Sequence, residues 1–160
     1  MKNFFLIFFL CFTLNNAVCI ETRIIHNIQN EIITNIDIKN EFKYLVALNN
    51  SLKELDKEKI LNISSESIIR QKIKKIEISK NFKEIKLDEQ YYDILLKNIY
   101  SRLKLETIDE FKIYLENYDL TIEDIKQKIT IDALWNELII QKYRSKITIN
   151  ESEIKKKILK

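Results

Sequence analysis

The sequence predicts a mainly α-helical protein in which a small N-terminal β-hairpin precedes a multi-helix orthogonal bundle with one long helix. Two observations predict the helices. Apolar residues recur every three or four positions over most of the chain after residue 34, as they do on one face of a helix. A threonine followed three positions later by an acid, the pattern of a capping box, occurs where four of these segments begin.

Residues 1–19 have the layout of a secretory signal peptide. Lys2 precedes an apolar run over residues 4–14, and polar residues follow. That run is shorter than the roughly 20 helical residues that a hydrocarbon core requires, so we expect cleavage and no stable membrane insertion. Small side chains at the positions that a signal peptidase reads place the cut between Cys19 and Ile20. The predicted mature domain is therefore residues 20–160.

Both cysteines, Cys11 and Cys19, would leave with the signal peptide, so the mature domain is expected to have no disulfide. Lipid attachment at Cys19 is disfavoured, because such sites prefer a leucine three residues earlier and a small residue just before, where this chain has Asn16 and Val18. The formal charge of +3 at pH 7, with both signs interleaved, gives no strong attraction to nucleic acid.

The chain contains no glycine and no proline. Phosphate-binding loops, dinucleotide fingerprints and glycine-flanked nucleophile elbows are thereby excluded, because each needs backbone angles that only glycine adopts at low cost. Sharp turns are expected to use asparagine, which tolerates positive φ better than most residues.

The hairpin is predicted from residues 23–28, which are short and rich in β-branched side chains, followed by a polar turn and by Ile32 and Ile33. The first helix is predicted to begin at Thr34, where Asp37 completes a capping box. Further boxes pair Thr107 with Glu110, Thr121 with Asp124, and Thr148 with Glu151.

Two more helices are predicted from periodicity over residues 64–78 and 88–103. The long helix is expected from Thr121 to about Lys146, which corresponds to roughly 39 Å at 1.5 Å per residue. A basic tail helix follows over residues 151–160. We find no repeat and no second domain.

Five phrases of the sequence, in order and spacing, resemble the N-terminal domain of the SurA family of periplasmic chaperones. In that family a short hairpin ending in E-V-I-T-x-x-D leads into the first helix, and the long helix exits through V-x-x-x-I-T-V-S-x-x-E-I. The corresponding phrases here are residues 23–37 (RIIHNIQNEIITNID), 87–89 (LDE), 105–111 (LETIDEF), 120–125 (LTIEDI) and 143–154 (YRSKITINESEI).

The resemblance implies a periplasmic domain with a peptide-binding fold that holds unfolded, aromatic-rich outer-membrane proteins. Family members usually continue into parvulin-type prolyl isomerase domains, whose sites are lined by histidines and built on glycine-containing loops. This chain has one histidine and no glycine. The resemblance therefore predicts chaperone binding, with no catalytic residue and no cofactor.

The residues that could serve in catalysis, metal binding or anion binding are more simply explained by structural roles. His26 lies in the predicted hairpin without a second histidine, so neither a metal site nor a triad is expected. The paired acids 109–110 and 123–124 sit in first helical turns, where capping explains them. The lysine clusters 72–75 and 155–157 are expected to be solvated faces, because acids are interleaved with them.

Apolar and aromatic stripes on the first and long helices are the candidate peptide-binding residues. Most of each stripe must be core, but a groove between the two helices could leave part of it open to a peptide. The candidates are Tyr44, Leu45, Leu48, Trp135, Leu138, Ile139 and Tyr143. Exposed apolar surface of this kind also predicts self-association in competition with peptide.

The sequence leaves three hypotheses of function. The first is an ATP-independent holdase that binds unfolded outer-membrane proteins or other apolar peptides. The second is the N-terminal part of a parvulin-type prolyl isomerase whose catalytic domain lies beyond Lys160, which the downstream DNA would reveal. The third is a helical adaptor for one folded partner, which would form a single stoichiometric complex.

Overall fold

The computed structural model describes residues 21–146 and confirms the predicted fold class. The signal peptide, the cut between Cys19 and Ile20, the Thr148 cap and the tail helix lie outside the described residues. In chain order the elements are β1 (Ile24–Ile28), β2 (Glu31–Thr34), α2 (Asn35–Leu48), η1 (Asn50–Glu54), α3 (Lys57–Asn81), α4 (Glu89–Arg102), α5 (Ile108–Glu116), α6 (Ile122–Tyr143) and η2 (Arg144–Lys146).

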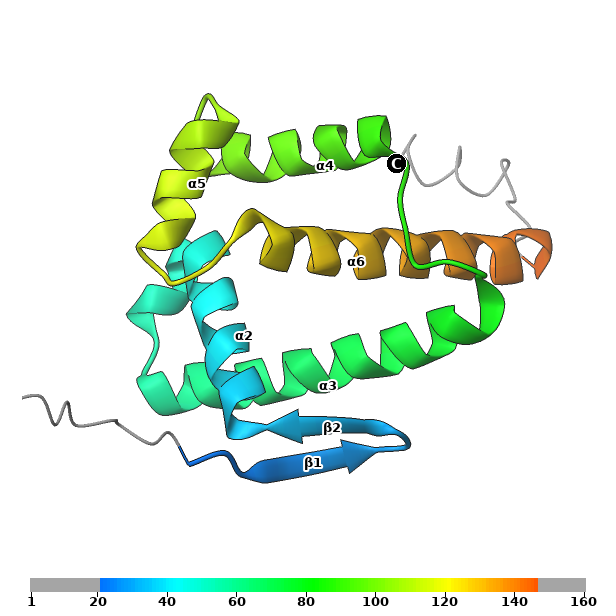
Figure 1. Ribbon diagram of the computed structural model, residues 1–160, viewed down its shortest axis with the longest axis horizontal. Helices are drawn as coiled ribbons and strands as arrows, with labels where there is room; N and C mark the ends of the chain where they lie inside the picture. The colour runs from blue at the N-terminus through cyan, green and yellow to red at the C-terminus, as the bar shows by residue number, and fades with distance from the viewer. Residues whose placement is uncertain (1–20, 147–160) are drawn as a thin grey trace, which may run out of the picture.

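Helix α6 runs through the middle of the molecule (Figure 1). Helix α3 packs along one side of α6 and α4 along the other, while α2 and α5 lie at the end where α6 begins. The antiparallel β1–β2 hairpin packs against α3. Within residues 21–146, no helix combines the length and apolar character needed to cross a membrane.

The core has two parts because α6 changes its buried face halfway along. In its first half, Ile125 and Ile129 pack with Phe111 and other residues of α2, α4 and α5. In its second half, Ile131 and Leu134 pack against Ile78 of α3. Positions nine apart, such as 125 and 134, lie on opposite sides of a helix with 3.6 residues per turn. Helix α6 therefore buries one side against α4 and α5, and then the other against α3.

Capping fixes the helix starts largely as predicted. Complete boxes, with both reciprocal hydrogen bonds, form at Thr34 and at Thr121. At Thr107 only half of the box forms, because the carboxylate of Glu110 accepts from the backbone N–H of Glu106, at 2.9 Å, instead of from that of Thr107. Each hydroxyl accepts one of the backbone N–H groups that a helix start leaves without a partner.

Two local predictions were wrong. Helix α3 begins at Lys57, well before the predicted start at Ser64, and with 25 residues it is longer than α6 with 22. Its start was missed because Asp56 makes no side-chain capping bond and the first turn is charged. The positive φ angles of the described residues fall at Gln29, Lys104 and Asp119, and none falls at asparagine.

Candidate functional site: a groove between three helices and an exposed helix face

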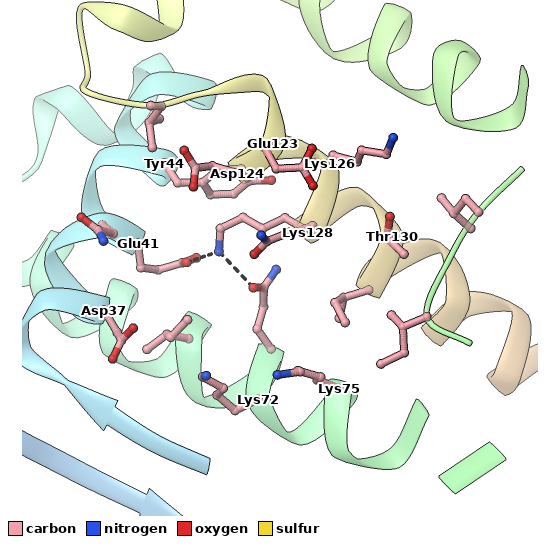
Figure 2. Close-up of a pocket in the computed structure, with 18 of the residues that line it drawn as sticks. Asp37, Glu41, Tyr44, Lys72, Lys75, Glu123, Asp124, Lys126, Lys128 and Thr130 are labelled. Atoms are coloured by element: carbon pink, nitrogen blue, oxygen red, sulfur yellow. Dashed lines mark hydrogen bonds and ion pairs between the residues drawn. The ribbon is translucent and has the colours of Figure 1, made fainter. Parts of the chain in front are cut away.

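Helices α2, α3 and α6 enclose a groove of about 590 Å³, and residues 85–87, which follow α3, also line it. Figure 2 shows charged side chains from all three helices converging on this space. Its volume lies within the range of small-molecule sites. The structure thus contains a groove between the first helix and α6, as predicted, but most of the residues that line it are polar or charged.

A buried ion pair connects the three helices beside this groove. Glu41 of α2 is 2% exposed and pairs with Lys128 of α6, as the dashed line in Figure 2 shows. From α3, the Ser67 hydroxyl donates to Glu41 Oε1 at 2.8 Å, and Gln71 Oε1 accepts from Lys128 Nζ at 3.0 Å. A buried charge survives only when it is paired and hydrogen-bonded in this way. The network therefore fixes the walls of the groove.

Tyr44 forms the aromatic part of the groove wall. The ammonium of Lys128 lies 4.5 Å from the centroid of its ring, which is cation–π geometry. Burial, together with the negative charges of Asp132 and Glu41, raises the pKa of the Tyr44 hydroxyl far above its ordinary value of 10. Tyr44 is therefore neutral at every physiological pH.

The lysines predicted to form a solvated cluster are instead paired with acids of other elements. Lys72 and Lys75 hold the two carboxylate oxygens of Glu31 in β2, at 2.7 and 2.9 Å, and Lys74 binds Asp132 of α6 at 2.7 Å. Hydrogen bonds from Lys72 and Lys75 lower the pKa of Glu31. These lysines fasten the hairpin and α6 to α3, and their charges are largely compensated.

A second feature lies on the far half of α6. The stripe that carries Ile125 and Ile129 continues, at helical spacing, through Asn136 to Ile140 and Tyr143. In the first half this stripe is core. Beyond it α4 is no longer alongside (Figure 1), and Ile140 and Tyr143 are 60% and 47% exposed. We call Ile140 and Tyr143, with the polar Asn136 beside them, the α6 face.

The seven candidate residues do not form one surface. Tyr44 and Leu48 pack against the core that α2 shares with α4 and α5, whereas Trp135 packs against the core formed with α3. Leu138 is 3% exposed, so it is core and contacts no peptide in this conformation. Leu45 and Ile139 are half-buried, and only Tyr143 of the seven is largely exposed. Ile140, which lies on the α6 face, was missed.

The other residues considered for catalysis or metal binding have structural roles. His26 Nε2 lies 3.3 Å from Ser65 Oγ, a contact that joins β1 to α3. The carboxylate of Asp124 accepts from the N–H of Thr121 in the capping box. No group of three histidine, cysteine or acidic side chains within residues 21–146 is arranged to hold a metal ion.

Sequence reasoning also missed the Glu41–Lys128 pair. One signal was present: Glu41 stands at the apolar spacing of α2, three residues after Ile38 and four before Leu45. A charged residue at such a position indicates a buried partner, but periodicity does not say which residue that is.

No family model, curated protein or solved structure matches the chain.

Proposed function

We propose that this domain binds unfolded polypeptides as an ATP-independent holdase, with outer-membrane proteins in a bacterial periplasm as its clients. The exposed α6 face is the observation that carries the proposal. Monomeric proteins seldom leave grouped apolar side chains in water, and such groups mark sites of interaction. The resemblance of the sequence to SurA chaperones favours the same function.

The surroundings of the α6 face suit reversible binding of apolar segments. Ile140 and Tyr143 are flanked by polar side chains that are held in place: Lys142 pairs with Glu77 of α3 at 2.9 Å, and Gln141 donates to Glu137 at 2.9 Å. An apolar centre with a polar rim is typical of protein interfaces. Complete burial of an apolar side chain contributes about 1.5–3 kcal/mol, so two of them support weak binding that needs no nucleotide to release it.

The test measures aggregation of an unfolded β-barrel protein by light scattering after dilution from urea, with and without residues 20–160. The wild-type domain should slow aggregation, and Ile140→Asp should abolish most of that protection, because a carboxylate on the α6 face cannot be buried against a client. The matched control is Ile113→Asp in α5, where the isoleucine is 64% exposed and far from the α6 face (Figure 1). If the wild-type domain does not change the rate of aggregation, the proposal is contradicted.

A further inference from the structure

The α6 face lies in the last turns of the chain that the structure describes. Ile140 is 60% exposed and Tyr143 is 47% exposed. Among the described residues, α4 runs beside only the first half of α6 (Figure 1). Helix α6 ends at Tyr143, and η2 ends three residues later, at Lys146. Residues 147–160 therefore follow the exposed surface directly in the chain, which places them well to cover it.

Residues 151–160, with the sequence ESEIKKKILK, have the composition of an amphipathic partner for this face. In the helix predicted for them, Ile154 and Ile158 stand four positions apart and would share one side. Two glutamates stand near the start of the segment, and all four of its lysines follow them. Such a helix has a narrow apolar side and a charge that changes from negative to positive along its length.

The charges beside the α6 face change sign in the opposite direction. Arg144 and Lys146 form the basic end, in η2. Glu137, about one turn before the exposed isoleucine, accepts a hydrogen bond from Gln141 and makes no ion pair within residues 21–146. Beyond it on that side, α4 begins with Glu89 in its first turn. An antiparallel helix would place its acids beside η2 and its lysines beside Glu137, so that unlike charges meet at both ends.

The connecting residues 147–150 are long enough to reverse the chain. Each extended residue spans about 3.3 Å, so these four reach about 13 Å, which exceeds the roughly 8–10 Å between the axes of packed helices. A helix of ten residues extends about 15 Å, whereas positions 136 to 143 span about 10 Å of α6. A helix over residues 151–160 can therefore lie along the whole α6 face.

We propose that residues 151–160 dock antiparallel on the α6 face of their own chain and compete there with clients. Ile154 and Ile158 contact the two exposed apolar side chains of the face. Because the connection is short, the local concentration of the segment is in the millimolar range, so that even a weak contact keeps the face covered. The inference rests on the proposed function in naming the α6 face as the client site, and it adds an internal competitor that a client must displace.

The first experiment is photo-crosslinking of residues 20–160 without a client. A photoreactive apolar amino acid at position 140 should form an adduct with residues 151–160 of the same chain, identified by mass spectrometry of proteolytic fragments. At position 113, on α5, it should not. Ile154→Asp/Ile158→Asp should abolish the adduct. Leu159→Asp, on the other side of the predicted helix, is the matched control and should keep it. Absence of the adduct, or an adduct that joins two chains, would overturn the proposal.

The second experiment repeats the aggregation assay with Ile140 intact. Ile154→Asp/Ile158→Asp should protect the unfolded β-barrel protein at a lower concentration than wild type does, by about tenfold if the segment covers the face nine-tenths of the time. A double variant that protects no better than wild type would refute the competition. If the adduct forms but neither wild type nor the double variant slows aggregation, the proposed function fails and the docking stands. If wild type slows aggregation but no adduct forms, the docking fails and the proposed function stands.

Discussion

Replacing Lys128 by methionine should strongly destabilise the domain, because it leaves the Glu41 carboxylate buried without its cation. Glu41 is 2% exposed, and after the change only the Ser67 hydroxyl donates to it among the described residues. Removing one partner of a buried ion pair costs about 3–5 kcal/mol. Small domains have a free energy of unfolding of about 5–15 kcal/mol, so this loss is a large fraction of the total.

Urea denaturation followed by circular dichroism measures the effect. With a slope of about 2 kcal/mol per molar urea, the midpoint should fall by about 2 M. The double variant Glu41→Leu/Lys128→Met removes both charges and should recover most of the loss, because two apolar residues need no partner there. Lys112→Met breaks the exposed pair with Asp109 and should change the free energy of unfolding by no more than about 1 kcal/mol.

The reasoning is refuted if Lys128→Met unfolds at the wild-type midpoint. It is equally refuted if Glu41→Leu/Lys128→Met is no more stable than Lys128→Met. In either case the Glu41 carboxylate would not be a buried charge whose stability depends on its ion pair with Lys128.

Four further predictions concern caps, pH, processing and catalysis. Thr121→Ala should lower the free energy of unfolding by about 1 kcal/mol through loss of the capping box, measured by urea denaturation. Because the pKa of Glu31 lies below its ordinary 4.5, its ion pairs stabilise the fold above that pH and are lost as pH falls through the lowered pKa. Glu31→Gln should therefore be less stable than wild type at pH 7 and lose less stability below pH 4.5, as urea midpoints across pH would show. Mass spectrometry of the exported protein should find Ile20, or a residue within a few positions, at the N-terminus, whereas an intact Met1 would contradict cleavage. A proline-containing reporter peptide should isomerise at its uncatalysed rate, on the order of tens of seconds, when residues 20–160 are added. Clear acceleration would contradict the expectation that these residues catalyse no isomerisation.

The features that could be predicted from sequence are those that neighbouring residues determine. The hairpin and the boxes at Thr34 and Thr121 need only contacts within a few positions, so their patterns are visible in the chain. The start of α3 was missed because no such local signal marks it. Asp56 makes no side-chain capping bond, and the first turn, which begins at Lys57, is charged. Its first residues are helical because the rest of α3 packs against α2 and α6.

The groove and the α6 face depend on how helices pack, which periodicity does not give. The stripes on α2 and α6 were expected to share one groove, but α6 turns its buried side halfway along. Leu138, at helical spacing from Ile131 and Leu134, is buried, while Ile140 is exposed. Each residue fits the apolar pattern equally well. Among the described residues, α4 runs beside only the first half of α6 (Figure 1), so Ile140 on that side is exposed, whereas Leu138 on the other side is buried.

Site-specific photo-crosslinking to an unfolded β-barrel protein tests client binding at the α6 face most directly. A photoreactive amino acid is placed at position 140 in one variant and at position 113 in another, since isoleucines at both positions are exposed. We expect a strong client adduct at position 140 and little at position 113. Equal adducts at the two positions, or none at position 140, would contradict the assignment of the α6 face as the client-binding surface.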